Sequence, residues 1–293
     1  NREKIYIVKR ELNLAVSPAL AADPDALKQE VADKLSVSQD DITFVKILKR
    51  SIDARGKHIK FHLKIQAYIH DSVPEFKPPK IYFRDVSEKE QVIVAGAGPA
   101  GLFAALRLIE LNLKPVIIER GKTIKDRRRD IADLNKIHLV NPNSNYCYGE
   151  GGAGTFSDGK LYTRSTKRGD VNKILQTLVA HAANENILID AHPHIGTNKL
   201  PQLIESIRES ILKCGGEIHF NTQLTDFIVD KNELKGVVVN NGEKEFIGEG
   251  LILATGHSAR DIFELLHHKN IHIEAKPFAM GVRIEHPQAL IDS

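Results

Sequence analysis

Three glycines stand at the spacing G-x-G-x-x-G in the hexapeptide Gly96-Ala97-Gly98-Pro99-Ala100-Gly101. In such a pattern the first glycine allows a tight turn, the second lets a pyrophosphate approach the backbone, and the third lets a helix pack closely on the preceding strand. A helix that begins here would offer free backbone N–H groups and the positive end of its dipole to phosphate oxygens. The spacing therefore predicts a dinucleotide-binding turn, with Gly96, Gly98, Pro99, Ala100 and Gly101 at the cofactor.

The elements around the turn fit this prediction. The apolar stretch 91–95 precedes it and is typical of a parallel strand buried on both faces. Apolar residues follow at helical spacing, and a second apolar stretch, 116–118, ends at Glu119. Strand, helix and strand form a βαβ unit, and the Glu119 carboxylate would accept hydrogen bonds from both ribose hydroxyls and repel a 2′-phosphate. We expect an α/β fold with a Rossmann-like parallel sheet.

Two further features favour FAD as the dinucleotide. Pro99 and Ala100 within the turn, and Glu119-Arg120-Gly121 after the second strand, resemble flavoprotein sequences, so Arg120 joins the candidate site. Residues 234–253 alternate as a β-meander around an Asn-Asn-Gly turn. The meander ends in Ala254-Thr255-Gly256. This triplet looks like the ATG motif of two-dinucleotide-binding flavoproteins, in which a strand returns to the sheet beside the cofactor.

A second glycine-rich stretch runs from residue 146 to residue 160. Five glycines within residues 149–159 exclude a regular element, and successive backbone N–H groups there would form an anion-binding nest. We expect this loop to cover the phosphates or the isoalloxazine ring through Gly151, Gly152, Ala153, Gly154, Thr155, Ser157, Asp158, Gly159 and Lys160. The alternative is a flexible surface turn, which would not need the interleaved aromatic residues Tyr146, Tyr148 and Phe156.

Residues 1–88 form a separate segment by their pattern. An alternating stretch at 4–14 predicts a strand, Asp23 and Pro24 predict a helix start, and 42–48 and 58–69 predict two further strands. Three prolines, at positions 74, 78 and 79, predict a stiff linker. The strand–helix–strand–strand order resembles part of a ferredoxin-like α+β module.

Composition excludes several classes of protein. The 293 residues are 42% hydrophobic and 27% charged, which is globular and not disordered, and no apolar run is long enough to span a bilayer. The net charge of +3 lies within residues 1–88 and is too small to argue for nucleic-acid binding. Two cysteines cannot form a disulfide framework, and no signal-peptide pattern opens the chain, so we expect a reducing, cytoplasmic location.

These motifs together resemble the glutathione-reductase-like FAD/NAD(P)-binding superfamily and, more narrowly, a group of uncharacterised bacterial FAD-dependent dehydrogenases. The narrower match is carried by residues 51–55, 151–161, 194–197, 254–261 and 278–286. The resemblance implies FAD binding and a redox role, with backbone contacts from Leu224 to the adenine, and it implies no particular substrate. Superfamily members close the FAD site with a C-terminal glycine-rich stretch, and no such stretch follows Arg283.

The predicted domains follow from these features. They are a small α+β N-terminal domain with its linker (1–88), an FAD-binding Rossmann-like domain (89–270) and the start of a substrate domain (271–293). A strand-like segment at 279–284 would open that last domain, which the chain barely begins.

We expect an FAD-dependent oxidoreductase, a dehydrogenase that moves a hydride through the flavin to or from a small-molecule substrate. NAD(P)H is a candidate reductant, although no second G-x-G-x-x-G is present. An FAD-dependent monooxygenase is the alternative on the same scaffold. An alternative of another class is a nucleic-acid or partner-binding protein acting through residues 1–88, where Phe44, Phe61 and Tyr68 could stack on bases. Since the RNP1 pattern is absent, an accessory domain is the favoured interpretation.

Other polar residues have structural interpretations. The charged run 125–130 fits a solvated helix face as well as a phosphate contact. His192 and His194 lack further ligands at zinc spacing, so no metal is expected. Cys147 and Cys214 are interpreted as incidental or structural thiols. No catalytic residue and no oligomeric state are assigned.

Overall fold

The computed structural model describes residues 8–72, 81, 83–163, 169–282 and 284–292. It divides into two compact units, 1–256 and 257–293. The domain boundaries expected after residues 88 and 270 stay predictions, and the three prolines of the expected linker lie outside the described residues.

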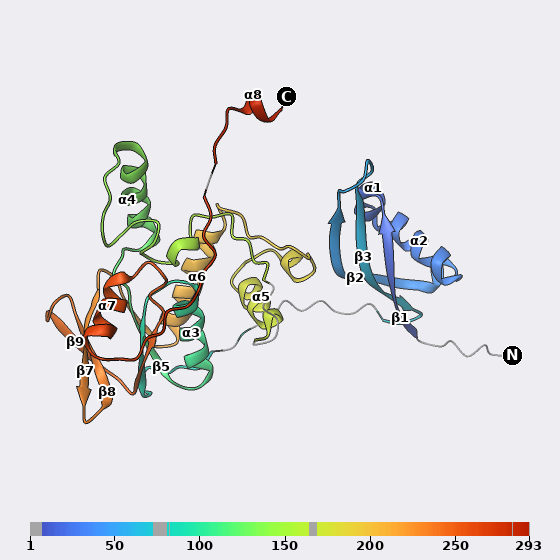
Figure 1. Ribbon diagram of the computed structural model, residues 1–293. Helices are drawn as coiled ribbons and strands as arrows, with labels where there is room; N and C mark the ends of the chain where they lie inside the picture. Colours follow the sequence, from blue (N-terminus) through green and yellow to red (C-terminus); the bar gives the residue numbers. More distant parts are fainter. Residues whose placement is uncertain (1–7, 73–80, 82, 164–168, 283, 293) are drawn as a thin grey trace. The chain divides into compact units, whose positions relative to one another are not determined.

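The N-terminal part is a three-stranded antiparallel sheet with two helices on one side (Figure 1). Its elements are β1 (Val8–Val16), α1 (Pro18–Ala22), α2 (Pro24–Leu35), the 3-10 helix η1 (Gln39–Asp41), β2 (Ile42–Asp53) and β3 (Lys60–Ile69), in the sheet order β1–β3–β2. The helix start predicted at Asp23 is confirmed, because the Asp23 carboxylate caps α2 by accepting from the N–H groups of Asp25 and Ala26. The ferredoxin-like assignment stays a prediction.

A four-stranded parallel sheet follows, in the order β10–β4–β5–β6. It contains β4 (Gln91–Ala95), β5 (Lys114–Ile118), β6 (Glu217–His219) and β10 (Gly250–Leu253), and α3 (Pro99–Glu110) connects β4 to β5. The predicted βαβ unit and parallel sheet are confirmed. Val94 and Ile117, one from each central strand, are fully buried, as expected for strands covered on both faces.

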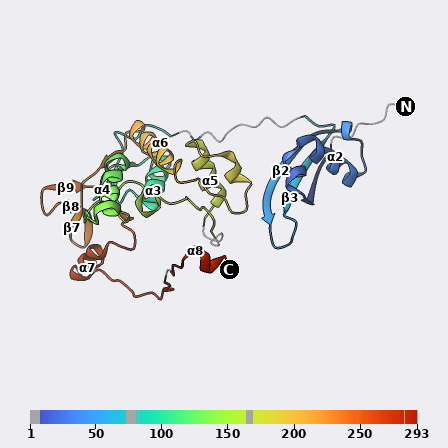
Figure 2. The ribbon, with the colours of Figure 1, turned by 90° about the horizontal axis from the view of Figure 1, so that it is seen from above.

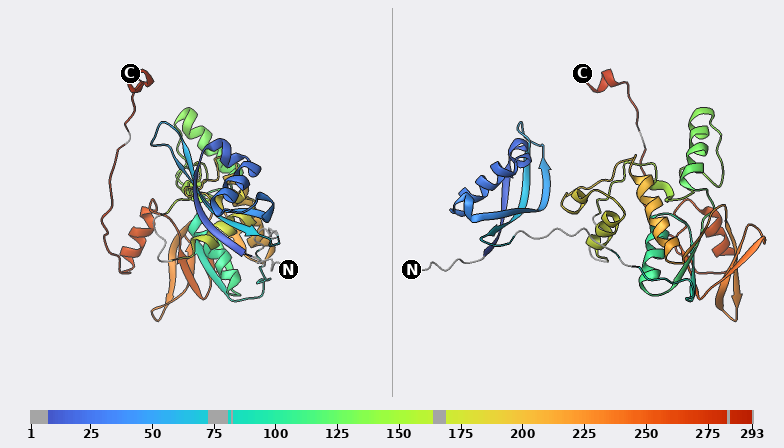
Figure 3. Two further views of the ribbon diagram at one scale, coloured as in Figure 1. Left: turned by 90° about the vertical axis from the view of Figure 1, so that its right-hand side faces the viewer. Right: turned by 180° about the vertical axis from the view of Figure 1, so that it is seen from behind.

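A separate antiparallel sheet contains β7 (Leu224–Asp230), β8 (Glu233–Val239) and β9 (Lys244–Ile247), coloured orange in Figure 3. The meander predicted over residues 234–253 is confirmed for β8 and β9 but wrong for its last strand, 250–253, which is not in this sheet, and the third strand is β7, before the predicted range. The turn of this sheet at Asn240, Asn241 and Gly242 has φ values of 50°, 58° and 97°, the left-handed region that asparagine and glycine tolerate best. β10 instead pairs with β4 of the parallel sheet, as the ATG-type motif predicts for a strand that returns to the sheet beside the cofactor.

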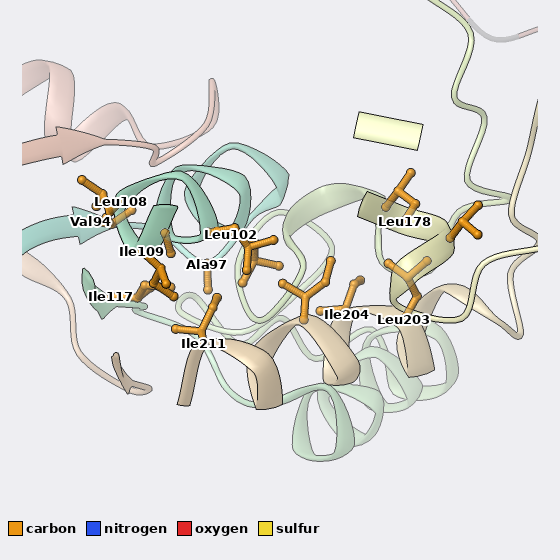
Figure 4. Packing of buried hydrophobic residues seen from close by; sticks show 14 of the residues in the cluster. Val94, Ala97, Leu102, Leu108, Ile109, Ile117, Leu178, Leu203, Ile204 and Ile211 are labelled. Carbon is orange, nitrogen blue, oxygen red and sulfur yellow. The ribbon is translucent and has the colours of Figure 1, made fainter. Parts of the chain in front are cut away.

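Helices from the middle of the chain complete the core. They are α4 (Ile124–Ile137), α5 (Val171–Ala180) and α6 (Leu200–Lys213), with the short 3-10 helices η2 (Gly152–Gly154) and η3 (Glu185–Leu188) (Figure 2). Figure 4 shows Leu102 of α3, Leu178 of α5, and Ile204 and Ile211 of α6 in one apolar cluster with the strands. This cluster fixes α3, and with it the glycine turn at its start.

Residues 257–293 contain α7 (Arg260–His268) and α8 (Gln288–Ile291). The strand expected at 279–284 is wrong, because the described residues of this segment form no strand. A strand needs a neighbour for its backbone N–H and C=O groups, and no described residue pairs with this one. Its apolar residues Phe278, Met280 and Val282 are 79–85% exposed.

Candidate functional site

The predicted turn between β4 and α3 has the geometry that its glycines allow. Gly96 has a φ of 110°, and a Cβ there would lie 2.4 Å from the carbonyl oxygen of Ala254. A Cβ on Gly101 would lie 1.8 Å from the Gly96 carbonyl oxygen. Gly98 is the N-cap of α3, no side chain caps this helix end, and Pro99 and Ala100 beside it are exposed. The first N–H groups of α3, which have no partner within the helix, are thus directed at the space beside Gly98.

The predicted Ala254-Thr255-Gly256 segment lies beside this turn. The Ala254 N–H donates to the Ala95 carbonyl oxygen at 2.8 Å, and the Thr255 Cα lies 3.4 Å from where a Gly96 Cβ would stand. The structure therefore brings together two motifs that are more than 150 residues apart in sequence.

The second glycine-rich stretch contacts the same turn. The Gly151 N–H donates to the Ala97 carbonyl oxygen at 2.8 Å, and a Cβ on Gly152 would lie 3.0 Å from the Gly98 Cα. Thr155 within the loop is fully buried. The loop is therefore held against the turn by hydrogen bonds and packing instead of projecting freely from the surface. Among the predicted loop residues, the exposed ones are Ala153, Ser157, Asp158 and Lys160.

Glu119 joins the turn to both neighbouring loops. Its carboxylate is 5% exposed; Oε2 accepts from the Ala97 N–H at 2.8 Å. Oε1 accepts from the N–H groups of Gly121 at 2.8 Å and Gly149 at 3.0 Å. A carboxylate offers about four lone-pair positions, and three of them are occupied by these N–H groups. The expectation that Glu119 accepts from both ribose hydroxyls therefore exceeds the positions that remain.

Several predicted hydroxyl donors are engaged within the loop itself. The Thr155 hydroxyl donates to the Glu150 carbonyl oxygen at 2.8 Å. The Ser157 hydroxyl donates to the Gly154 carbonyl oxygen at 2.7 Å and accepts from the Gly159 N–H at 3.1 Å. These side chains shape the loop. The N–H groups of residues 149–152 likewise donate within the protein, so the expectation of successive free N–H groups forming an anion-binding nest is wrong for this part of the loop.

The remaining predicted site residues are Arg120, Lys160 and Leu224, and each makes different contacts. The Arg120 guanidinium lies 4.3 Å from the Tyr148 ring centroid, which places Arg120 against the glycine-rich loop. Lys160 is exposed and pairs with Asp158 at 3.4 Å. Leu224 is 5% exposed at the start of β7. Two residues earlier, the Thr222 N–H donates to the Glu119 carbonyl oxygen at 2.8 Å, so this strand begins near the acidic residue.

Two buried charged residues are not among the residues predicted from the sequence. Arg127 is fully buried, with Ile124 and Ile131 on the same side of α4. The solvated-face interpretation is correct for Arg128 and Arg129, which are exposed, but wrong for Arg127. Glu150, inside the glycine-rich loop, is 1% exposed. The spacing of Ile124, Arg127 and Ile131 along one helix face is the signal that could have found the arginine.

The described residues offer no metal site and no membrane helix. No group of three or more histidine, cysteine, aspartate or glutamate side chains gathers in a way that could hold a metal within the described ranges. His192 instead packs its ring on Tyr162, with centroids 4.5 Å apart. None of the described helices is both long and apolar enough to cross a membrane.

Sequence comparisons give three similarities. Residues 8–68 match a family model described as a domain of unknown function (DUF8436). A protein of Clostridium beijerinckii, described as uncharacterized, is 38% identical over 292 residues, covering 94% of this chain and 54% of that protein. The thiamine thiazole synthase of Aeropyrum pernix is 30% identical over 153 residues, covering 52% of this chain and 44% of that enzyme. The chain thus spans about half the length of the curated relatives that it matches.

Among solved structures, THI4 of Thermovibrio ammonificans is similar over 62% of this chain and 63% of its own, with 14% identity and a TM-score of 0.39. A 3-ketosteroid-delta4-(5alpha)-dehydrogenase of Rhodococcus jostii is similar over 60% of this chain and 49% of its own, with 16% identity and a TM-score of 0.35. Because both TM-scores are below 0.5, these similarities carry no argument about activity, and the fold class stands on the strand pairing described above.

Proposed function

We propose that this protein binds FAD and is an FAD-dependent oxidoreductase, a dehydrogenase acting on a small molecule. The observation that carries the proposal is the convergence of three motifs on one point. Gly96 lies against Ala254, and Gly98 lies against Gly152. The Glu119 carboxylate ties the turn to the loop through its bonds to Ala97 and Gly149.

The residues present fit a dinucleotide with an unmodified ribose. Gly98 would allow a pyrophosphate to reach the start of α3, whose first N–H groups have no side-chain cap. The buried Glu119 carboxylate favours ribose hydroxyls and disfavours a 2′-phosphate. The glycine-rich loop, which nicotinamide dehydrogenases of this fold do not need for their fingerprint, favours FAD by forming a second wall beside the turn. Similarity to a thiamine thiazole synthase over half of the chain is compatible with a site of this kind.

When bound, the isoalloxazine ring would accept or donate a hydride, and the protein would supply position, electrostatics and exclusion of water. Gly96, Gly98 and Gly101 would hold the pyrophosphate, and Glu119 the adenosine ribose. The loop 151–160 would cover the phosphates, and residues 254–256 would approach the cofactor through their backbone. The substrate is left open, and O₂ consumption during turnover would favour the monooxygenase alternative.

The test is the visible absorption spectrum of the purified full-length protein, before and after incubation with FAD. We expect flavin absorption bands and release of FAD, not FMN, on denaturation. A protein that stays colourless after incubation with FAD contradicts the proposal. Rapid mixing of the flavin-loaded protein with NADH or NADPH then shows whether either one bleaches the flavin.

Gly98→Ala sharpens this test. A Cβ on Gly98 would have no protein atom nearer than the Gly152 Cα at 3.7 Å, which is ordinary van der Waals contact, so the apoprotein should keep its thermal stability. The same methyl group would stand where the pyrophosphate must approach, so we expect FAD affinity to fall at least about a hundredfold. Gly56→Ala is the control, because a Cβ on Gly56 meets no atom within 4 Å. Unchanged FAD affinity in G98A would place the ligand elsewhere.

A further inference from the structure

A charged cluster of Arg127 on α4, Glu150 within the glycine-rich loop and the partly exposed Arg208 on α6 has no place in the dinucleotide fingerprint. Glu150 is 1% exposed and Arg127 fully buried. The Arg208 Nη1 donates to both Glu150 carboxylate oxygens at 2.7 Å. The Glu150 Oε2 also accepts from the Ile124 N–H, at the start of α4, at 2.8 Å. Burying a charge is costly unless the charge has partners. We therefore ask which groups the buried Arg127 and Glu150 bind and what these bonds hold in place.

The N–H groups of the Arg127 guanidinium donate to acceptors in the loop. Nε donates to the Asn145 carbonyl oxygen at 2.9 Å, and Nη2 to the Tyr146 carbonyl oxygen at 3.1 Å. Nη1 donates to the Glu150 carbonyl oxygen at 2.7 Å and to the Thr155 hydroxyl at 3.1 Å. Four of the five N–H groups of a guanidinium are thus directed at acceptors within residues 145–155, and none of these acceptors is a carboxylate.

The backbone of the loop is shaped to admit this side chain. Gly149 has a φ of 117°, and a Cβ there would lie 2.5 Å from the Arg127 Cδ. The guanidinium also lies 5.2 Å from the Phe156 ring centroid, within the range of cation–π attraction. Gly149 and the Phe156 ring of the loop therefore both accommodate the Arg127 side chain.

The hydrogen bonds from Arg127 orient the backbone of the loop. Arg127 draws the carbonyl groups of residues 145, 146 and 150 towards α4. The Gly151 N–H belongs to the same peptide unit as the Glu150 carbonyl group, and it donates in the opposite direction, to the Ala97 carbonyl oxygen of the turn. Arg127 therefore orients the peptide unit through which the loop contacts the turn, and Glu119 holds the neighbouring Gly149.

We propose that Arg127 is a positioning residue for the cofactor site: it holds the glycine-rich loop against the Gly96–Gly101 turn, so that FAD meets a preformed second wall. This inference rests on the proposed function. Arg127 does not touch the cofactor; it acts through the loop carbonyls. Lysine cannot replace it, because a single ammonium nitrogen cannot reach acceptors spread along a planar fork.

The experiment compares Arg127→Lys with Arg128→Lys in the full-length protein. Arg128 is exposed on the same helix, so R128K keeps the charge and helix propensity without entering the cluster. We measure FAD affinity by quenching of flavin fluorescence, the visible circular dichroism of the bound flavin, and amide hydrogen exchange of residues 149–156 in the apoproteins. All titrations are made well below the unfolding temperature.

For R127K we expect the Kd for FAD to rise about tenfold or more, a changed flavin dichroism and faster exchange of the loop amides. R128K should match the wild type in all three. A wild-type Kd and wild-type dichroism in R127K would overturn the inference, even if its unfolding temperature is lower. If the wild type does not bind FAD, the proposed function fails, whereas the exchange measurement still decides whether Arg127 orders the loop.

A milder variant covers the case in which R127K does not fold. Thr155→Val removes the hydroxyl that accepts from Arg127 and donates to the Glu150 carbonyl oxygen, while keeping the shape of the side chain. We expect a smaller rise in the Kd for FAD, about threefold, with faster exchange of the same amides. Wild-type values for both would contradict the inference.

Discussion

The Glu119 carboxylate is predicted to be a ligand group, but in this structure it is also a structural one. It accepts three backbone hydrogen bonds from Ala97, Gly121 and Gly149. Each of these residues belongs to a different segment, and the segments contain glycines with little side-chain packing of their own. A buried acceptor is therefore a direct way to hold them together, because orphaned N–H groups in the interior are costly.

Glu119→Gln should destabilise the apoprotein, independently of any cofactor. An amide keeps one acceptor oxygen but turns the other into a donor, which would face either the Ala97 N–H or the N–H groups of Gly121 and Gly149. We expect the free energy of unfolding to fall by about 1–3 kcal/mol, measured by urea denaturation. Glu209→Gln is the control, since Glu209 is exposed and its ion pair with Lys213 is long, at 4.0 Å. Equal stability of E119Q and E209Q would argue against the structural role.

At the scale of elements, α5 and α6 are linked through one buried histidine. His181 follows α5 directly and is 4% exposed. Its Nδ1 lies 2.7 Å from the Thr177 carbonyl oxygen, so that nitrogen carries a proton, and its Nε2 lies 3.0 Å from the Ser210 hydroxyl on α6. Burial lowers the pKa of His181, partly opposed by the Thr177 carbonyl group, so the neutral ring is favoured in the folded protein.

The lowered pKa of the buried His181 predicts that the free energy of unfolding falls in mild acid. Below the ordinary histidine pKa of about 6.5, the unfolded chain takes up a proton that folded His181 does not, so the free energy of unfolding falls as the pH falls. The contribution is at most about 1.4 kcal/mol per pH unit and levels off once the folded protein is protonated too. Thermal unfolding of wild type and His181→Gln between pH 7.5 and 5 checks this. The variant should show the shallower decline, and parallel curves would exclude His181 as the cause.

Elements that depend on neighbouring residues in the sequence were predictable from it. Elements that depend on contacts with distant segments of the chain were not. The cap of α2 at Asp23, strand β4 and the Asn240–Gly242 turn follow from residues next to one another. The segment 279–284 alternates like a strand but forms none among the described residues, because alternation does not supply a neighbouring strand. Arg127 was missed for a similar reason: its burial depends on carbonyl groups of a loop about twenty residues away.

At the scale of the molecule, the sheet of residues 8–69 has its own apolar core. Val31, Ile42 and Ile65 are completely buried within it, and the family match at 8–68 covers the same region. Val86, by contrast, belongs to the core of the parallel-sheet region. Its N–H donates to the Cys214 carbonyl oxygen at 2.8 Å, and a Cβ on Gly215 would lie 2.6 Å from the Ser87 backbone nitrogen. Packing of the parallel-sheet region therefore includes residues before position 89, and the domain boundary expected after residue 88 stays a prediction.

Two N-terminal truncations test where the cofactor-binding part begins. A fragment of residues 83–293 keeps Val86 and its hydrogen bond to Cys214, so it should fold and bind FAD with the affinity of the full chain. A fragment of residues 89–293 loses a side chain that is 1% exposed, which should lower the free energy of unfolding by about 1–3 kcal/mol, and it should unfold at lower temperature. Fluorescence titration with FAD and thermal unfolding of both fragments give the comparison. If the 83–293 fragment folds but does not bind FAD while the full chain does, the segment 1–82 contributes to FAD binding.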